Sequence, residues 1–375
     1  MKIAIDATIV RKENTGTGFY ILNLLNGLLK IDAKNEYIIF IDENVAKNML
    51  KLEKSNFKIV NKVFRYKLTR ILWQLIILPI VLKKKKVDIL HSANYVTPLY
   101  KLGFKIIVTI HDLTFILFPE KYTITKRLFY RLMIPIFVKI SDKIIAISNN
   151  TKNDILKIFK VAEEKVVVIY ATCSENFNST IDRNKNLEVL SKYNIDKTFL
   201  LFVGMIEPRK NIISILNAFK EMDKEVDADL VVVGKKGWYF KEIEDFVSQS
   251  KNFNLKNKII FTGYVPENEI KSLFQNALFF IFPSFYEGFG LPPLQAMACG
   301  TPVITSNISS LPEVVGDAAI YVDPHKLGEL KNAMVYLYEN IEKREELIKK
   351  GFSQCDKFRI EIVARSLVDV IESMV

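Results

Sequence analysis

The stretch from Ala277 to Gln295 reads ALFFIFPSFYEGFGLPPLQ, an apolar run that leads into a glycine-rich loop and a pair of prolines. The run Ala277–Phe282 is typical of a parallel strand that is covered on both faces. Glycines let a loop approach a ligand closely, and prolines suit the first turn of a helix whose free N–H groups point back at that loop. This order predicts an open α/β sheet with a nucleotide-binding edge.

The alternation of short apolar runs with helix-length amphipathic stretches continues along the whole chain. The pattern falters between Thr172 and Lys197, where polar residues dominate, and we place a linker there. We therefore expect the α/β fold class, with two Rossmann-like doubly wound domains facing each other across a cleft. The expected domains are residues 1–178 and 197–355, followed by a helix in 356–375 whose return to the first domain the sequence leaves open. Expected strands include Lys2–Asp6, Val87–Leu90, Lys105–Ile110, Phe199–Val203 and Ala319–Val322, and expected helices include Phe19–Lys30, Lys126–Lys139, Asn211–Glu221 and Glu267–Asn276.

The charge is unevenly distributed. The 375 residues carry a net charge of +11, but the first 180 hold 29 basic and 15 acidic side chains while the remainder has a balance of −3. The segment Lys54–Val87 alone has ten basic residues and no acidic one. Such asymmetry predicts a polyanionic partner, either nucleic acid or an anionic membrane surface. Drift toward lysine in an AT-rich genome is the alternative source of the charge.

Composition excludes several classes of protein. Hydrophobic residues make up 49% and charged residues 25%, which excludes wholesale disorder and coiled coils. The odd set Cys173, Cys299 and Cys355 has no paired spacing, so we expect neither a disulfide framework nor a zinc site. No signal peptide is visible. The longest apolar run, Ile71–Leu82, is shorter than the roughly twenty residues of a spanning helix.

Candidate site residues follow the ends of expected strands. Glu287 lies on the glycine loop, where its carboxylate could accept hydrogen bonds from sugar hydroxyls. Arg209 and Lys210 follow strand Phe199–Val203 at a helix start, where they could grip a diphosphate. His111 closes strand Lys105–Ile110. An ordinary turn with a surface glutamate, an exposed basic pair and a structural histidine are the alternatives.

Three other interpretations fail. Asp227-Ala228-Asp229 resembles a metal-binding pair, but it precedes a strand and so lies at the opposite edge. The three histidines are too far apart in sequence for a zinc cluster. No phosphate-binding loop of the Gly-x-x-x-x-Gly-Lys type occurs.

Taken together, the motifs resemble those of the retaining glycosyltransferases of family 4, which have the two-domain GT-B architecture. Within that family the chain is similar to bacterial mannosyltransferases of O-antigen and surface-polysaccharide assembly. The strings span nearly the whole chain in the family's order. They are Thr15-Gly16-Thr17-Gly18-Phe19-Tyr20, Val108-Thr109-Ile110-His111-Asp112-Leu113, Val203-Gly204-Met205-Ile206-Glu207-Pro208-Arg209-Lys210-Asn211, Glu287-Gly288-Phe289-Gly290-Leu291-Pro292 and Gln295-Ala296-Met297-Ala298-Cys299-Gly300-Thr301-Pro302-Val303.

The resemblance implies a role for each matching residue. Arg209 and Lys210 would neutralise the donor diphosphate, Glu287 would hold the sugar, and His111 would reach the sugar hydroxyl at carbon 6. The remaining donor-binding positions would be Gly16 and Gly18 in the first domain, and Tyr264, Val265, Gly288, Phe289, Gly290, Leu291 and Gln295 in the second.

Two residues depart from the family pattern. Gln295 stands where relatives usually carry a second glutamate that binds ribose, and the loss of charge would weaken donor binding about fivefold to tenfold. Met205 stands where many relatives carry arginine, and Arg209 would then take over its role. We interpret the Gln295 departure as tuning rather than inactivation, since Glu287, Arg209 and Lys210 remain.

The implied activity is transfer of a hexose, mannose from GDP-mannose, onto a growing lipid-linked cell-surface glycan. The implied enzyme needs no cofactor and no active-site metal. Its acceptor would be a glycan on a polyprenyl diphosphate, and the basic first domain would rest on the inner face of the cytoplasmic membrane. A UDP-sugar donor, for glucosyl or N-acetylglucosaminyl transfer, is the alternative. A non-catalytic protein that binds membranes or nucleic acid is a more distant one, and nucleic acid is favoured only by the charge because RNA-binding motifs are missing.

Overall fold

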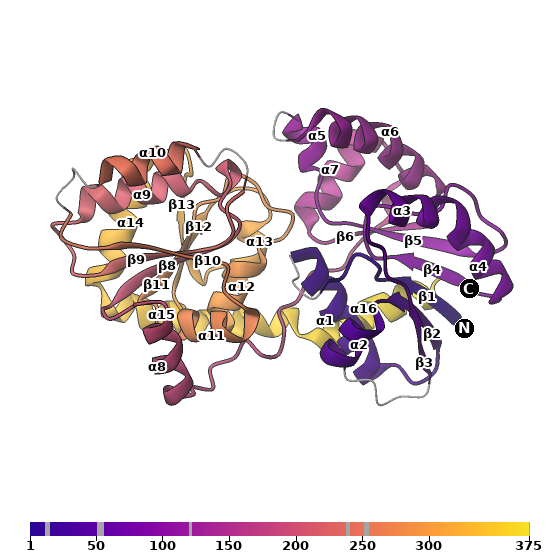
Figure 1. Ribbon diagram of the computed structural model, residues 1–375, viewed down its shortest axis with the longest axis horizontal. Coiled ribbons are helices and arrows are strands. Elements are labelled where there is room, and N and C mark those ends of the chain that lie inside the picture. Colours follow the sequence, from indigo (N-terminus) through magenta and orange to yellow (C-terminus); the bar gives the residue numbers. More distant parts are fainter. Residues whose placement is uncertain (12–15, 51–55, 120–121, 238–240, 251–254, 375) are drawn as a thin grey trace. The chain divides into compact units, whose positions relative to one another are not determined.

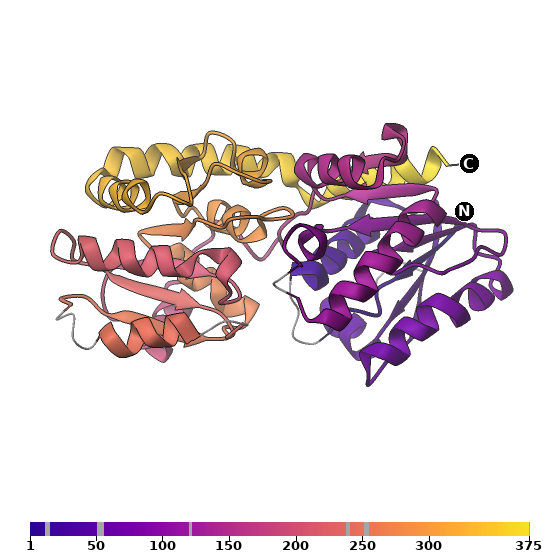
Figure 2. The same cartoon turned by 90° about the horizontal axis from the view of Figure 1, so that it is seen from above.

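The computed structural model describes residues 1–375 apart from 12–15, 51–55, 120–121, 238–240, 251–254 and 375. It divides into a first unit, Met1–Ser174 with Phe358–Val375, and a second unit, Glu175–Lys357. Each unit contains one sheet with helices on both faces, as Figures 1 and 2 show. The predicted class, doubly wound α/β in both halves of the chain, is therefore confirmed.

The first unit is built on a seven-stranded sheet in the order β3-β2-β1-β4-β5-β6-β7, and its strand pairs are parallel. Its central strands are almost entirely buried, as continuous apolar runs require. The elements are β1 (Lys2–Asp6), α1 (Gly16–Ile31), β2 (Glu36–Ile41), α2 (Glu43–Met49), β3 (Phe57–Asn61), α3 (Lys67–Leu72), η1 (Trp73–Ile77), α4 (Leu78–Lys84), β4 (Ile89–Ser92), β5 (Lys105–Ile110), α5 (Thr114–Leu117), α6 (Ile124–Ile140), β6 (Lys143–Ala146), α7 (Asn149–Phe159), η3 (Glu163–Lys165), β7 (Val166–Val168) and α16 (Ile360–Glu372).

The second unit is built on a six-stranded sheet in the order β10-β9-β8-β11-β12-β13, again with parallel pairs. The short turn η5 (Asp356–Phe358) connects it to α16. Its elements are α8 (Arg183–Lys192), β8 (Phe199–Val203), η4 (Pro208–Lys210), α9 (Ile212–Met222), β9 (Asp229–Val233), α10 (Lys241–Ser250), β10 (Ile259–Gly263), α11 (Glu267–Asn276), β11 (Phe279–Phe282), α12 (Leu291–Ala298), β12 (Val303–Ser306), α13 (Leu311–Val315), β13 (Ala319–Val322), α14 (Leu327–Glu339) and α15 (Ile341–Cys355).

Both sheets reverse their strand order at one place. The reversal lies between β1 and β4 in the first unit and between β8 and β11 in the second. Open α/β sheets bind their ligands at such a switch point, outside the carboxyl ends of the strands. The two switch points are therefore the places at which to look for function.

Three expectations about the elements differ from the structure: the linker, strand β3 and the position of strand β4. The expected linker, Thr172–Lys197, contains helix α8, which packs on α11 within the second unit. The second unit accordingly begins at Glu175 rather than at 197. Strand β3 was missed because Lys58 and Asn61 interrupt its apolar pattern, as an edge strand allows. Strand β4 lies two residues beyond the expected Val87–Leu90 and includes two polar residues, His91 and Ser92.

The segment between β3 and β4 bends where Pro79 interrupts a helix. Proline cannot donate a hydrogen bond to the carbonyl four residues earlier, and it crowds that carbonyl. The chain responds with the π-helical turn η1, in which the Leu78 N–H donates to the Trp73 carbonyl instead. The Tyr100 hydroxyl donates to the carbonyl of Ile76 at 2.6 Å. Single π turns of this kind occur frequently at functional sites.

The C-terminal helix α16 packs on α1 inside the first unit, as Figure 1 shows. Gly27 makes this close approach possible. A Cβ atom at Gly27 would lie 2.8 Å from the Ala364 Cβ and 2.9 Å from the Ile360 carbonyl oxygen. No helix in the described part of the chain combines the length and the apolar character needed to cross a membrane.

We predict that Gly27→Ala lowers the free energy of unfolding of the first unit by about 1–3 kcal/mol, because α16 must move away from α1. Urea unfolding measures the effect. Gly328→Ala is the control, since a Cβ there would meet no atom within 4 Å. In a double-mutant cycle, Ala364→Gly should cost less in the Gly27→Ala background than alone. Equal costs would show that this contact does not limit the helix packing.

Candidate active site

The loops after β8 and β11 meet at the switch point of the second unit. The backbone N–H of Phe285 donates to the Arg209 carbonyl at 2.9 Å, and Ser284 Oγ lies 3.0 Å from the same carbonyl oxygen. These contacts join residues more than 70 positions apart in the chain. The site residues expected on the two loops are thereby brought together.

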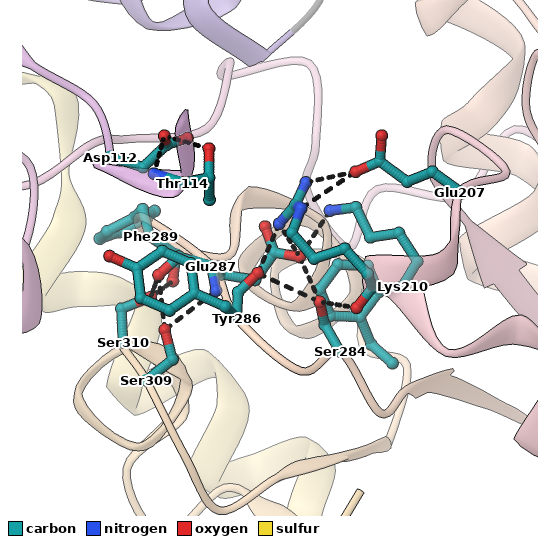
Figure 3. Close-up of polar contacts among 12 residues, drawn as sticks. Asp112, Thr114, Glu207, Lys210, Ser284, Tyr286, Glu287, Phe289, Ser309 and Ser310 are labelled. Carbon is teal, nitrogen blue, oxygen red and sulfur yellow. Dashed lines mark hydrogen bonds and ion pairs between the residues drawn. The ribbon is translucent and has the colours of Figure 1, made fainter. Parts of the chain in front are cut away.

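A buried ion cluster forms around the Glu287 carboxylate. Its Oε1 lies 2.6 Å from Lys210 Nζ and 2.9 Å from Arg209 Nη1, and it accepts a 2.6 Å hydrogen bond from Ser284. Figure 3 shows Lys210 and Ser284 pointing toward Glu287. The Lys210 ammonium also lies 4.7 Å from the ring centre of Phe282, a cation–π distance.

Glu207 completes the cluster, although we expected no role for it from the sequence. Its Oε1 accepts from Arg209 Nη2 at 2.7 Å and from Nε at 3.0 Å. Two cations therefore meet two carboxylates, and the cluster is neutral. Arg209 is the most exposed of the four, with 17% of its side-chain surface accessible. The sequence signal that could have identified Glu207 was its place in the string Glu207-Pro208-Arg209-Lys210, two residues before Arg209.

The cluster fixes the protonation of Glu287. Burial alone would raise the pKa of this carboxyl, but the charges of Arg209 and Lys210 and the hydrogen bonds from Lys210 and Ser284 outweigh it and lower the pKa to about 2. Burial and the neighbouring Arg209 lower the pKa of Lys210, against the opposing effect of Glu287. The glutamate is thus an anion at neutral pH and can only accept hydrogen bonds.

The cluster holds the Glu287 carboxylate by one of its two oxygens. The contacts from Lys210, Arg209 and Ser284 all go to Oε1. Within the described residues, no donor contacts Oε2. A carboxylate with one oxygen anchored and one open is suited to accept a hydrogen bond from a hydroxyl group.

Two serines after β12 hold the backbone of the glycine loop. The Glu287 N–H donates to Ser309 Oγ at 2.9 Å, and the hydroxyls of Ser309 and Ser310 both donate to the Glu287 carbonyl. Ser310 also donates to the Phe289 carbonyl at 2.7 Å, and Figure 3 shows both serines beneath the loop. The sequence analysis did not identify Ser309 and Ser310. The available signal was a pair of polar residues after the end of a strand.

Gly290 sets the direction in which the loop enters α12. Its φ of 108° is one that side chains disfavour, and a Cβ would lie 2.8 Å from Leu311 Cδ2. Leu291 then opens the helix, with Pro292 in its first turn. The expected binding positions Gly288, Phe289, Gly290 and Leu291 therefore lie between the ion cluster and a helix N-terminus. Gln295 is buried in the same helix, with 8% of its surface exposed.

The loops after β9 and β10 lie at the same edge of the sheet. Gly234 approaches the loop after β8 so closely that a Cβ would lie 1.8 Å from the Gly204 carbonyl oxygen. Tyr264, after β10, is 41% exposed, and the Lys235 ammonium lies 4.4 Å from its ring centre. The next residue, Val265, is buried. The position expected for the nucleotide base therefore presents an aromatic surface.

Three expected site residues belong to the first unit. Gly16 is exposed at the first position of α1, and Gly18 is buried two residues later; the preceding residues of that motif, 12–15, lie outside the described residues. His111 follows β5 and is 6% exposed. Its Nε2 lies 3.0 Å from the Ala93 carbonyl oxygen, so this nitrogen carries a proton. Burial lowers the pKa of His111, which leaves a neutral ring with Nδ1 as an acceptor.

The other histidine of the first unit, His91, lies inside the sheet. His91 is fully buried in β4, and its Nε2 is 2.9 Å from the Thr109 hydroxyl. Burial lowers the pKa of His91 to about 3. Among the described residues no group of three or more His, Cys, Asp or Glu side chains is arranged to hold a metal ion.

Two family models match the chain. The model "Glycosyl transferases group 1" covers residues 184–354, and the model "Glycosyltransferase Family 4" covers residues 15–172. O-antigen chain mannosyltransferase B of Escherichia coli is 30% identical over 285 residues, which are 75% of this chain and 73% of the relative. The chain is a family 4 glycosyltransferase.

Other relatives and solved structures agree with this family. The serotype-specific mannosyltransferase WbdA of Escherichia coli is 30% identical over 276 residues, 72% of this chain but only 34% of that longer protein. The crystal structure of Anabaena HepE with UDP-glucose covers the whole of both chains, with a TM-score of 0.75 and 15% identity. The glycosyltransferase therefore has the GT-B fold, and the expected family is confirmed.

Ionised Glu287 should stabilise the glycosyltransferase in a pH-dependent way. Its folded-state pKa of about 2 lies below the ordinary value of 4.5, so the stabilisation is complete above pH 4.5 and is lost as the pH falls toward 2. We predict that Glu287→Gln lowers the free energy of unfolding by roughly 3 kcal/mol at pH 7, and that this difference shrinks as the pH approaches 2.

Urea unfolding at a series of pH values measures this difference. Glu339→Gln is the control, because Glu339 is exposed and should show no such dependence. A Glu287→Gln effect that stayed constant from pH 7 to pH 3 would contradict the ion-cluster explanation.

Proposed function

We propose that this glycosyltransferase moves mannose from GDP-mannose to a growing, lipid-linked cell-surface glycan, with retention of the anomeric configuration. The observation that carries the proposal is the buried cluster of Arg209, Lys210 and Glu287 at the switch point of the second sheet. The choice of mannose is supported by the O-antigen mannosyltransferases among the relatives.

The cluster would hold the donor at two of its groups, the diphosphate and the sugar. Arg209, the most exposed member, would meet the diphosphate together with the N-terminus of α12, whose free N–H groups attract anions. Glu287 Oε2 would accept a hydrogen bond from a sugar hydroxyl. The base would lie against Tyr264, and Gln295 would bind the ribose.

Transfer would proceed from the face of the sugar that the diphosphate leaves. The bond between the anomeric carbon and the diphosphate oxygen breaks, and the acceptor oxygen bonds to the same face of that carbon. The hydroxyl proton of the acceptor passes to the departing phosphate oxygen. Arg209 and Lys210 stabilise the negative charge that builds up on this leaving group, so that catalysis depends on positioning and electrostatics.

His111 would contribute as a neutral hydrogen-bonding group. With Nε2 donating to the Ala93 carbonyl, Nδ1 is left to accept from the sugar hydroxyl at carbon 6. We propose that no metal takes part, because the two cations can supply the positive charge that a metal ion would otherwise bring to the diphosphate.

The donor and the site can be tested together by measuring nucleotide release from GDP-, UDP- and ADP-sugars, with and without membrane extract. We expect release of GDP from GDP-mannose, unchanged by EDTA. Arg209→Ala and Glu287→Ala should each reduce kcat/KM at least about 100-fold, since a lost charge contact to a leaving group costs roughly 3 kcal/mol. Lys235→Ala, at the base position, should chiefly raise KM.

Other outcomes would separate the alternatives. Release from a UDP-sugar would overturn the mannose assignment while keeping the site; this is the second candidate, favoured by the HepE complex with UDP-glucose. Loss of activity with EDTA that Mg²⁺ restores would contradict the metal-free mechanism. If no nucleotide were released from any donor, Gln295→Glu would be the first variant to test, since glutamate is the usual residue of the family at this position.

We further propose that the first unit rests on an anionic membrane surface. Two stripes of exposed aliphatic side chains, each with four-residue spacing, lie on its helices and define what we call the apolar stripes. The spacing of four places each set on one helix face. One stripe is Ile124, Leu128, Leu132 and Ile136 on α6, and the other is Leu68, Leu72, Ile76 and Ile80 along α3, η1 and α4.

Basic side chains accompany both stripes. Arg127 and Arg131 are exposed beside the α6 stripe, and Lys83–Lys86 are exposed at the end of the other. The two helical segments share one core, and the Lys67 ammonium of α3 lies 5.7 Å from the ring centre of Tyr130 on α6. Aliphatic stripes flanked by cations match the chemistry of an anionic lipid surface.

The aromatic side chains of these helical segments are mostly in the core. Trp73 is 6% exposed and packs against Phe40 and Phe64, and Phe137 is fully buried. The apolar stripes, rather than the aromatic side chains, therefore provide the surface that contacts lipid in this proposal.

Co-sedimentation with vesicles tests the membrane proposal. We expect binding to vesicles with anionic lipid that falls when salt is raised, since exposed charges are screened. Leu128→Glu with Leu132→Glu should weaken binding at least about tenfold, because two apolar side chains are lost from the lipid contact. Leu187→Glu is the matched control, since Leu187 is 67% exposed on α8 of the second unit. Binding that neither salt nor the double variant changes would contradict the proposal.

A further inference from the structure

Arg70 is a largely buried cation that has no carboxylate partner among the described residues. It lies on α3 with 6% of its surface exposed, and its Nε is enclosed and makes no hydrogen bond. Within the described residues, no carboxylate forms an ion pair with it. A largely buried charge without a carboxylate partner is unfavourable, and an anion from outside the chain would offset that cost.

The nearest carboxylate, Asp6 at the end of β1, does not neutralise Arg70. Asp6 Oδ1 accepts from the N–H and the hydroxyl of Thr8, at 3.0 and 2.7 Å. Its Oδ2 accepts a 2.6 Å hydrogen bond from Gln74 Nε2. Asp6 attracts Arg70 only from a distance, and it raises the pKa that burial lowers.

The other charged groups around Arg70 are positive. Arg11 lowers the pKa of Arg70, in addition to the larger effect of burial. Burial, Lys126 and Arg70 together lower the pKa of Lys67, one turn before Arg70 on the same helix. Tyr130 is the remaining titratable neighbour. Several cations around one carboxylate, whose oxygens are already bonded, form a site for an anion of more than one charge.

The site borders the switch point of the first sheet, where ligands bind in this kind of fold. Asp6 of β1 is paired in register with Ser92 of β4. Four further buried polar atoms on these strands and the neighbouring segments have no hydrogen-bond partner, although such atoms are normally satisfied. They are Gln74 Oε1, His91 Nδ1, Ser92 Oγ and Thr97 Oγ1.

The chain gives this anion site an apolar neighbour. Leu68 and Leu72, which belong to the apolar stripes, lie two residues before and after Arg70 on α3, so they occupy the outer face of the helix that Arg70 crosses from within, and they are 67% and 47% exposed. A ligand whose anionic end reached Arg70 could therefore lay an apolar chain along α3. We propose that Arg70, with Arg11 and Lys67, binds the phosphate or diphosphate headgroup of a lipid-linked acceptor.

This inference rests on the proposed membrane surface but not on the proposed donor. It assigns headgroup recognition to the first unit, apart from the ion cluster of the second. The headgroup chemistry is shared by free pyrophosphate and by a lipid diphosphate. The apolar chain distinguishes the two sources, because only the lipid can use the α3 surface.

The test is calorimetric titration of the full chain with farnesyl diphosphate below its micelle concentration, with pyrophosphate and with farnesol. We expect farnesyl diphosphate to bind at least about tenfold more tightly than pyrophosphate, and farnesol not to bind measurably. Arg70→Gln should weaken farnesyl diphosphate binding at least about tenfold, while Arg65→Gln, an exposed arginine on the same segment, should change it less than about twofold.

Two further variants separate the possible sites. Diphosphate bound at the ion cluster of the second unit should persist in Arg70→Gln and disappear in Lys210→Met. Leu72→Gln should remove the advantage of farnesyl diphosphate and leave pyrophosphate binding unchanged. Unaltered binding in Arg70→Gln would overturn the proposal, and equal affinities for pyrophosphate and farnesyl diphosphate would overturn its lipid part.

The Tm of the Arg70→Gln variant distinguishes ligand binding from a structural role of Arg70, because the two roles predict changes of opposite sign. Without ligand, Arg70→Gln should raise the Tm of the first unit by about 2 °C or more, because an unpaired buried charge is removed. Farnesyl diphosphate should raise the Tm of the unaltered protein and not that of the variant. A lower Tm for Arg70→Gln would show that Arg70 supports the fold. These experiments contain no nucleotide sugar, so they can succeed even where the donor assignment fails.

Discussion

The carboxylate of Glu287, buried between Lys210 and Arg209, is the interaction on which the catalytic edge of the second unit depends. It joins the loops of two strands, β8 and β11, that are adjacent in the sheet but far apart in the chain. Loss of any one member would leave an uncompensated charge in a buried position, which proteins tolerate poorly. The serines after β12 extend the same constraint to a third loop, since they hold the backbone on either side of that carboxylate.

Much of the fold could be predicted because its determinants are local. Strands such as Phe199–Val203 and Lys105–Ile110 are uninterrupted apolar runs, and in a parallel sheet the residues that follow such runs meet at one edge. That logic located Arg209, Lys210 and Glu287. It could not locate Ser309, because a hydroxyl that bonds a backbone group 22 residues away leaves no periodic pattern. Helix α8 was missed for a related reason: its polar sequence is stabilised by packing on α11 rather than by its own composition.

The exposed face of α3, η1 and α4 illustrates a second limit of periodicity. The apolar run Ile71–Leu82, which contains Trp73, indicates that part of this helical segment is buried. It does not indicate which face of the helix turns toward the core. The π-helical turn before Pro79 adds a residue to one turn and so changes which side chains point outward beyond it. Trp73 packs into the core while Leu72 and Ile76 are exposed, and only the three-dimensional structure separates them.

The cations at the two switch points differ in whether a carboxylate pairs with them, and this difference affects which ligands each site would select. In the second unit each cation is already paired with a carboxylate, so a bare inorganic anion gains little there and is repelled by Glu287. In the proposed donor complex, a nucleotide sugar would bring hydroxyl donors for Glu287 Oε2 as well as phosphates for Arg209, and it would therefore satisfy both signs of the cluster. In the first unit no carboxylate among the described residues pairs with Arg70, so charge alone would attract the proposed headgroup. A paired cluster favours a composite ligand, whereas a cation without a carboxylate partner favours a simple anion.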